Sequence, residues 1–391
     1  MNFVPPSVFA RMVDLRRDLH RHPELSWEEE RTATRIAAEL ERLGLSVRRV
    51  AGTGLIADLP GAAPGPIVAL RADTDALPVH EQTGLTFASE REGVMHACGH
   101  DGHSSMLLGA AELLLAGPPP PCPVRLLWQP AEERGAGAVA LIEAGALEGV
   151  ELIFGGHLDR RFPAGTLIVS EGPVNASTDT FRVEITGQQG HGARPHETLD
   201  AVVAGSLLVT SLQTVVSREV NPAHPSVLTV GTFQAGTAGN VIAGQALLEG
   251  TIRAQDPEVR QHLIASLKRI GQAIGMLHGA KVEVSVKDGT PPVINPPGAT
   301  AIARRAALEV TDPELVVPLP NANMGGEDFA YYLERVAGCY IRYGGLVPGR
   351  ESFPAHSSQF DFDEAALGCG AAWLARVAVL GGEHLRGAGT P

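Results

Sequence analysis

Cysteine is scarce in this chain of 391 residues. Its four cysteines, Cys98, Cys122, Cys339 and Cys369, lie far apart and form no C-x-x-C pair. Four isolated thiols are too few for a disulfide framework and are typical of a reducing compartment, so we expect a cytoplasmic protein. The N-terminal segment has no apolar core of signal-peptide length, and no eighteen apolar residues run together. Neither a signal peptide nor a transmembrane helix is therefore expected.

Positive charge is also in short supply. The chain has 31 Lys and Arg residues against 44 Asp and Glu residues, which gives a formal charge of −13. A nucleic-acid-binding surface needs clustered Lys and Arg, so no nucleic-acid partner is expected. Hydrophobic residues make up 44% of the chain, and its length suits two domains with sizeable cores.

Several catalytic signatures are absent. The chain has no Walker A loop, no H-E-x-x-H and no G-x-S-x-G. GTGLIA (52–57) and GAGAVA (135–140) are only fragments of a dinucleotide loop, because neither has the full G-x-G-x-x-G between a strand and a helix. An oxidoreductase with a nicotinamide cofactor is therefore disfavoured.

The first part of the chain alternates between apolar runs and helical spacing. This pattern predicts a strand at 67–72, a helix at 104–117, a strand at 124–128, a helix at 137–147 and a strand at 151–156. Nearly unbroken apolar strands joined by helices indicate an α/β fold with a mostly parallel sheet covered on both faces. Upstream, Ser26 and Glu29 have the spacing of a capping box, which predicts a helix that ends at Gly44.

The pattern changes in the middle of the chain. Strands are predicted at 181–186, 226–234, 245–253 and 281–287, with helices at about 198–218 and 257–276. This β-α-β-β-α-β order is that of a ferredoxin-like unit. A Pro-rich stretch at 288–297 predicts a hinge, after which the chain rejoins the first domain. We therefore expect a discontinuous domain, 1–177 and 290–391, with a ferredoxin-like domain, 178–289, inserted into it.

Polar residues follow the ends of three predicted strands in the first domain. Asp73 comes after 67–72, Glu132 and Glu133 come after 124–128, and His157 comes after 151–156. Open α/β sheets bind ligands at the carboxyl ends of their strands. Separate loops are thus expected to bring these side chains together.

The stretch HACGHDGH (96–103) holds five side chains that bind metals or protons. Cys98 and His100 suit zinc, manganese, cobalt or nickel, and Glu133, His157 and His356 are candidates for the remaining ligands. A catalytic metal needs three or more protein ligands and an open position for water. The alternatives are a nucleophilic cysteine with a histidine base, or a loop with a buried thiol and solvated histidines.

Two acidic pairs complete the candidates in the first domain. Glu132 and Glu133 are adjacent, so on an extended stretch one can face a metal while the other acts as a general base. The alternative is a solvated pair at a helix N-terminus. Asp73 and Asp75 either orient a ligand by a hydrogen bond to a metal-bound group or form an ordinary turn.

The middle domain has three further candidates. His191 lies among glycines in GQQGHGARPH, Asn240 lies in GTAGNVI, and Arg253 ends a predicted strand. Together an imidazole, an amide and a guanidinium suit a carboxylate and a developing oxyanion. Taken singly, each is interpreted as a surface polar residue.

Seven stretches resemble, in order, the motifs of the metal-dependent N-acyl-amino-acid amidohydrolases. This family includes hippurate hydrolases, auxin-conjugate hydrolases and N-acetyl-diaminopimelate deacetylases, within the aminoacylase–carboxypeptidase clan. The stretches are RADTDALP (71–78), HACGHDGH (96–103), LLWQPAEE (126–133), HGARPH (191–196), GTFQAGTAGNVIAGQALLEGTIR (231–253), MGGEDFAYYLE (324–334) and PAHSSQFDFDEAAL (354–367). The resemblance covers nearly the whole chain. It departs from the family's usual pattern after His157 and at Gly192.

The resemblance implies an active site with two divalent metal ions (manganese, zinc, cobalt or nickel). The matching ligand positions are Cys98, His100, Glu133, His157 and His356. The inserted domain would serve as a lid and a dimerisation domain.

The resemblance also implies roles for five other residues. Glu132 matches the catalytic base, and Asp73 matches the orienting aspartate. His191 resembles a lid histidine that reaches the active site of a neighbouring subunit. Asn240 and Arg253 resemble the residues that hold the substrate's free carboxylate.

The expected activity is hydrolysis of the amide bond between an acyl group and an amino acid. A dipeptidase or carboxypeptidase on the same scaffold uses identical chemistry and stays open. A non-catalytic metal-binding or ligand-binding protein is a further alternative. The expected partners are an N-acyl amino acid or short peptide and further copies of the chain in a homodimer or higher homo-oligomer, with no membrane.

Overall fold

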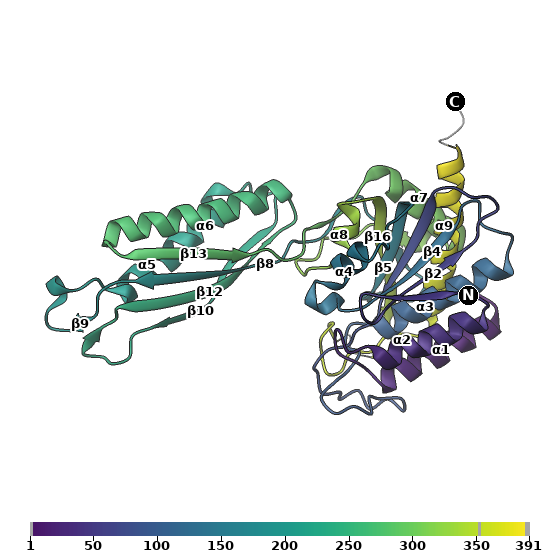
Figure 1. The fold of residues 1–391 in the computed structure, drawn as a ribbon, viewed down its shortest axis with the longest axis horizontal. Helices are drawn as coiled ribbons and strands as arrows, with labels where there is room; N and C mark the ends of the chain where they lie inside the picture. The colour runs from purple at the N-terminus through teal and green to yellow at the C-terminus, as the bar shows by residue number, and fades with distance from the viewer. Residues whose placement is uncertain (1–2, 351–352, 388–391) are drawn as a thin grey trace. The chain divides into compact units, whose positions relative to one another are not determined.

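The chain folds into two compact units. The computed structural model describes residues 3–350 and 353–387 (Figure 1). Within the described residues, unit 1 comprises 3–172, 294–320, 328–350 and 353–387, and unit 2 comprises 173–293 and 321–327. The strands β7 (Gly172–Asn175) and β14 (Val293–Asn295) lie where the chain passes between the units.

A mixed sheet with the order β1-β2-β4-β3-β5-β16-β6-β15 forms the centre of unit 1. Its strands are β1 (Val47–Val50), β2 (Gly54–Leu59), β3 (Ile67–Asp73), β4 (Val124–Gln129), β5 (Val150–Pro163), β6 (Leu167–Ile168), β15 (Val316–Val317) and β16 (Ala337–Leu346). The four central strands, β4, β3, β5 and β16, run parallel. The mostly parallel sheet predicted from the apolar runs is confirmed.

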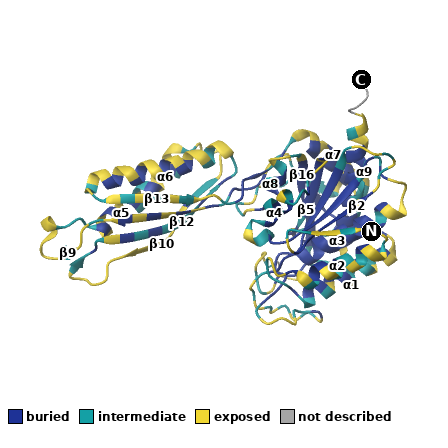
Figure 2. Cartoon of the chain, in the orientation of Figure 1, coloured by how far each residue is buried: buried dark blue, intermediate teal, exposed yellow. Residues whose placement is uncertain are grey.

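Helices cover both faces of this sheet (Figure 1). They are α1 (Pro6–Arg21), α2 (Glu30–Arg42), α3 (His100–Ala116), α4 (Gly137–Glu143), α7 (Pro297–Val310), α8 (Ala330–Leu333) and α9 (Ala365–Gly387). Alternate strand residues share a core with α3 and α9, among them Leu152 and Phe154. On the opposite face, an added side chain at Gly155 would meet Phe329, which directly precedes α8. Both faces are buried, as the near-continuous apolar strands require (Figure 2).

Unit 2 has the ferredoxin-like topology. Its elements are β8 (Asp179–Thr186), β9 (Gly190–His191), α5 (Ala201–Thr214), β10 (Ser226–Ala235), β11 (Val241–Ile242), β12 (Gln245–Ala254), α6 (Pro257–His278) and β13 (Lys281–Lys287). The main sheet has the antiparallel order β10-β12-β8-β13, with α5 and α6 on one face (Figure 1). Strict alternation along β8 buries Phe181, Val183 and Ile185 under the helices.

Two helices among the described residues are long and apolar enough to cross a membrane by length and composition alone. One is α9, most of which is buried in the core of unit 1. The other is α5 with its π-helical extension to Glu219, which packs its inner face on the sheet of unit 2. Buried core helices of this length pass the same criteria, so packing accounts for α9, whereas only 33% of the α5 segment is buried.

Three local predictions differ from the structure. The capping box at Ser26 and Glu29 is wrong, because neither side chain binds the first turn of α2, which begins at Glu30; the Glu24 carboxylate accepts the Arg31 and Thr32 N–H groups there instead. The strand predicted to end before His157 continues to Pro163. Glu132 and Glu133 lie in a 3-10 turn (Glu132–Arg134) rather than on an extended stretch.

Candidate metal centre

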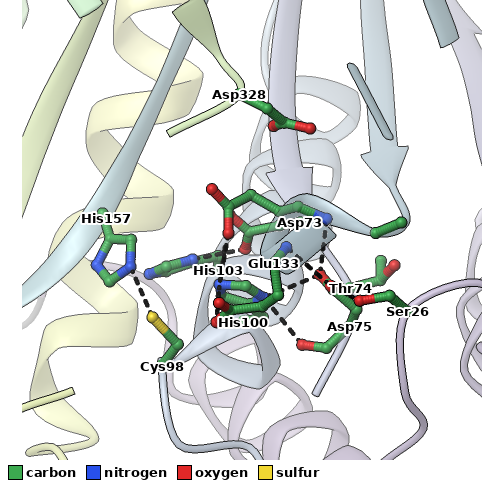
Figure 3. A network of polar contacts seen from close by, with 12 residues as sticks. Ser26, Asp73, Thr74, Asp75, Cys98, His100, His103, Glu133, His157 and Asp328 are labelled. Atoms are coloured by element: carbon green, nitrogen blue, oxygen red, sulfur yellow. Dashed lines mark hydrogen bonds and ion pairs between the residues drawn. The ribbon is translucent and has the colours of Figure 1, made fainter. Parts of the chain in front are cut away.

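Polar side chains of unit 1 converge at the carboxyl ends of its parallel strands (Figure 3). Asp73 ends β3, the 3-10 turn with Glu132 and Glu133 follows β4, and His157 lies within β5. Neighbouring parallel strands end at the same edge, so residues far apart in sequence meet there. Cys98 and His100 reach the same edge from the start of α3.

The five residues expected as metal ligands lie close together. Cys98 Sγ is 3.2 Å from His157 Nε2. His356 Nε2 is 3.4 Å and His100 Nε2 is 3.9 Å from Glu133 Oε1. Two groups, each with ligand atoms within 4.8 Å of one another, share Cys98: one adds His100 and His157, and the other adds Glu133 and His356.

Asp75 lies behind this cluster and connects three of its parts. His100 Nδ1 is 2.8 Å from the Asp75 carbonyl oxygen and 3.2 Å from its Oδ1. The Asp75 carboxylate also accepts hydrogen bonds from the backbone N–H groups of Glu132 and Glu133, each at 3.1 Å. Because His100 Nδ1 donates to Asp75, the Nε2 lone pair faces the cluster. This is the orientation that a metal-binding histidine requires.

His103 occupies the cluster without being available as a ligand. Its Nδ1 lies 2.7 Å from Asp73 Oδ1 and donates to it, and its Nε2 accepts the Leu158 N–H at 2.9 Å. Both ring nitrogens are therefore engaged. His157 differs, because its Nδ1 donates to the Leu158 carbonyl at 2.7 Å and its Nε2 faces Cys98. The motif HACGHDGH alone does not distinguish these histidines.

A buried ionic network holds Asp73, and sequence reasoning assigned no role to its other members. Arg71 donates to Asp73 at 2.7 Å, to Gln129 at 2.8 Å and to Asp328 at 2.9 Å. Gln129 in turn donates to both oxygens of Asp328 at 2.8 Å. The available signal was an arginine and a glutamine inside otherwise apolar strands, since such side chains are buried only when they are paired.

The donor set fits a divalent cation. Among the residues that the structure describes, His100 Nε2 and Glu133 Oε1 are buried and have no hydrogen-bond partner, and such atoms are rare unless a ligand satisfies them. Burial and the nearby Glu133 raise the pKa of the Cys98 thiol well above its ordinary value. Burial opposes the charge on His100, but Asp73, Asp75 and Cys98 together raise its pKa. A bound cation would replace these protons, because ligands bind metals in their deprotonated forms.

Two site residues adopt a left-handed backbone conformation. His356 has φ 68°, and its N–H donates to the Ala97 carbonyl at 2.7 Å. Ala131, directly before Glu132, has φ 52°. Non-glycine residues in this region are strained and persist only where surrounding contacts hold them, which is common at functional sites.

The remaining candidates belong to unit 2. His191 pairs with Val241 between β9 and β11, and the Gly192 N–H donates to the Asn240 carbonyl at 2.8 Å. A Cβ atom at Gly192 would lie 2.9 Å from that carbonyl oxygen, which explains the glycine there. His191 ends β9 and Asn240 directly precedes β11, so both are exposed neighbours, whereas Arg253 lies on β12 in the main sheet.

Comparisons with known proteins agree with this geometry. The model of the peptidase family M20/M25/M40 matches residues 69–379. The N-acetyl-L-cysteine deacetylase of Bacillus subtilis is 41% identical over 91% of this chain and 85% of its own. Thermostable carboxypeptidase 1 of Saccharolobus solfataricus is 36% identical over 94% of each chain. The crystal structure of the Bacillus subtilis YxeP protein, described as a dinuclear metal binding peptidase, has a TM-score of 0.87 and 36% identity, covering 97% of this chain and 99% of that one.

Proposed function

Because the chain belongs to the peptidase family M20/M25/M40, we propose that it is a metal-dependent hydrolase of N-acyl amino acids. It would cleave the amide bond to release a carboxylic acid and a free amino acid. The observation that carries this proposal is the convergence of five ligand-type residues beside a sixth, Glu132, whose Oε2 lies 4.0 Å from His100 Nε2. The deacetylase relative is named for this reaction class.

The proposed metal centre contains two divalent ions of manganese, zinc, cobalt or nickel. Its ligands would be Cys98, His100, Glu133, His157 and His356, whose mixture of sulfur, nitrogen and oxygen suits borderline metals. The two groups that share Cys98 support two adjacent positions. Such ions would supply Lewis acidity and an activated water near neutral pH.

The chain's own residues would handle the protons. Glu132 would take a proton from the attacking water and deliver it to the leaving amine nitrogen. Asp75 would keep Glu132 in place through its backbone N–H and fix the tautomer of His100. Asp73 would act as the orienting aspartate by holding His103, which in turn accepts the Leu158 N–H beside His157.

Unit 2 would supply substrate recognition. Arg253 and Asn240 are proposed to bind the free carboxylate of the amino acid, and His191 to stabilise the oxyanion of the tetrahedral intermediate. His191 Nδ1 accepts the Ala193 N–H at 3.0 Å, which leaves Nε2 as the side that can donate. In this proposal residues 178–289 act as the lid of the catalytic domain formed by 1–177 and 290–391.

A homodimer or higher homo-oligomer in the cytoplasm is part of the proposal. Val202, Val203 and Leu207 on α5, and Phe233 on the edge strand β10, are exposed apolar side chains on unit 2. An edge strand beside an apolar helix face suits association with a second copy. The four cysteines are all buried and free, in keeping with a reducing compartment.

A second candidate function is a carboxypeptidase or dipeptidase activity. It is favoured by the Saccharolobus relative, which is named a carboxypeptidase. The same centre would serve both reactions, and only the group on the substrate's N-terminal side differs. A non-catalytic binding protein is disfavoured, because Glu132 is present beside the full ligand set.

The test is amino-acid release from N-acetyl and N-benzoyl amino acids, with unblocked dipeptides assayed in parallel. The protein is stripped with a chelator and assayed with and without added manganese, zinc, cobalt or nickel. We expect release of amino acids from N-acyl substrates only when metal is restored. Release from dipeptides alone would favour the peptidase reaction, and no release by folded, metal-loaded protein would refute both.

A further inference from the structure

The stretch LSWEEE (25–30) has a role that the predicted capping box does not describe. Ser26 donates to Asp75 at 2.6 Å instead of accepting an N–H group of the helix that follows. Glu29 accepts the Ala131 N–H at 2.9 Å and the Thr53 hydroxyl at 2.7 Å. Both side chains thus turn away from α2 and reach the 3-10 turn of Glu132 and Glu133, directly or through Asp75.

Three successive backbone N–H groups at this turn donate hydrogen bonds to buried carboxylates. Ala131 donates to Glu29, while Glu132 and Glu133 donate to Asp75. No regular secondary structure satisfies these groups, so the two carboxylates replace it. The direction of the Glu132 side chain therefore depends on both anchors.

Ala131 is the strained point of the turn. It is fully buried and has φ 52° and ψ 39°, a left-handed conformation that costs an alanine free energy relative to the ordinary region. The bond from its N–H to Glu29 is a contact outside the turn that holds it there. Without that bond, the long bonds that its carbonyl accepts from the Ala136 and Gly137 N–H groups, at 3.4 and 3.3 Å, are left to hold its backbone.

Glu29 is costly as a purely structural residue. Its side chain is fully buried, and its hydrogen-bond partners among the described residues are neutral: Thr53, Ala131 and its own backbone N–H. Burial and the neighbouring charge of Asp75 raise its pKa, although these hydrogen bonds act in the opposite direction. A buried carboxylate without a cationic partner lowers stability. Because Glu29 lowers stability at this position, we infer that it is there for a functional reason.

We propose that Glu29 is a positioning residue for the catalytic base: it fixes Ala131 in the left-handed conformation that directs Glu132. The inference rests on the proposed function, in which Glu132 is the base. Glu29 itself touches neither the substrate nor the reacting atoms. Its effect should therefore fall on kcat more than on KM.

The test compares Glu29→Ala, Glu29→Gln and Glu29→Asp, with Glu28→Gln as the matched control. Glu28 is the neighbouring glutamate, half-exposed and paired with Arg91 on the surface. We expect Glu29→Ala to lower kcat by about 100-fold, the effect of misplacing a catalytic group by about 1 Å, with KM nearly unchanged. Glu29→Gln keeps an acceptor for Ala131 and should restore most of kcat. Glu29→Asp keeps the charge but is too short for both partners, so it should be slower than Glu29→Gln.

A second change tests the conformational step directly. Glycine adopts positive φ without the penalty that alanine incurs, so Ala131→Gly should partly compensate for a missing Glu29. We expect the double variant Glu29→Ala/Ala131→Gly to recover about 5-fold or more of kcat over Glu29→Ala alone, given the size of that penalty. Equal rates for the single and double variants would contradict the proposed step.

Amide hydrogen exchange of the segment 130–134 in the metal-loaded protein gives a readout without activity. Glu29→Ala should accelerate exchange there, whereas Glu29→Gln and Glu28→Gln should not. The inference is overturned if Glu29→Ala leaves both exchange and kcat unchanged, or if its loss of kcat follows loss of bound metal and Glu29→Gln does not restore it. Failure of the proposed function is distinct: it would show as Glu132→Gln with full turnover, or as wild-type protein without hydrolysis.

Discussion

His20 is the buried group whose charge the structure ties most directly to stability. It lies on α1 with 1% of its side chain exposed. Its Nδ1 is 2.9 Å from Asp101 Oδ2 and its Nε2 is 3.2 Å from Glu81 Oε1. Burial alone would lower its pKa, but the two carboxylates raise it from 6.5 to about 9. The imidazolium form, which donates from both nitrogens, is therefore the form in the folded protein near neutral pH.

The sign and size of the contribution of His20 to stability follow from the linkage between proton binding and folding. A group with a raised folded pKa stabilises the folded state fully below its unfolded pKa of 6.5, and this contribution is lost as pH rises through about 9. At about 1.4 kcal/mol for each pH unit, the contribution is about 3 kcal/mol. Of the described neighbours, Asp101 and Glu81 have lowered pKa values and His96 has one of about 4, so none of these titrates between pH 6 and pH 10.

The perturbation is His20→Gln, which keeps a polar side chain and removes the charge. Tryptophan fluorescence reports the unfolding of unit 1, because Trp27, Trp128 and Trp373 all lie in that unit. At constant metal content we expect the variant to melt about 6–12 °C below wild type at pH 6, at about 2–4 °C per kcal/mol. The difference should shrink as pH rises from 7 to 10.

The control is His22→Gln at the end of the same helix, where His22 is half-buried and donates to the Asp18 carbonyl at 2.9 Å. Its melting difference from wild type at pH 6 should be smaller than that of His20→Gln, because His22 is a third exposed and its carboxylate neighbours, Asp18 and Glu90, lie 3.6 Å away. A His20→Gln difference that stays constant between pH 6 and pH 10, or grows with pH, would refute the reasoning.

Three further predictions follow from the site and the cores. Glu132→Gln should bind metal like wild type yet lose about 10²–10⁴-fold in kcat; metal analysis of the same samples that are assayed for turnover checks this, and unchanged turnover would exclude Glu132 as the base. Asp75→Asn should weaken metal binding by about 10–100-fold, since it fixes His100 from behind; calorimetric titration measures it, and unaltered affinity would contradict that role. Leu267→Ala, in the core of unit 2, should lower the free energy of unfolding of that unit by about 2–5 kcal/mol. Calorimetry should show one unfolding transition at a lower temperature, while the melting temperature of unit 1, followed by tryptophan fluorescence, stays the same. A lower melting temperature for both units would argue that they unfold together.

Periodicity along the chain was enough to predict most elements of both units. Runs such as 67–72 and 124–128 are apolar at all but one position each (Arg71 and Arg125) because both faces of the sheet are covered, and that pattern needs no distant information. The alternation along 181–186 likewise reports one buried face. The placement of polar residues after strand ends predicted a shared edge, because parallel strands end together.

A local motif gave a wrong prediction where its side chains bind residues that are distant in sequence. Ser26 and Glu29 satisfy the spacing of a capping box, yet both side chains bind residues far along the chain. The first turn of α2 does not need these two side chains, because the Glu24 carboxylate accepts its Arg31 and Thr32 N–H groups. Spacing contains no information about which of these partners is present.

The sequence by itself determined the residue types of the centre, the order of the elements and the edge of the sheet at which the centre forms. Tertiary structure alone decided which nitrogen of each histidine faces the cluster, that His356 approaches Glu133, and that Glu29 holds Ala131. The physical reason is the distance along the chain over which each kind of information acts. Periodicity follows from local backbone geometry, whereas the engagement of a polar atom depends on whichever partner folding buries beside it.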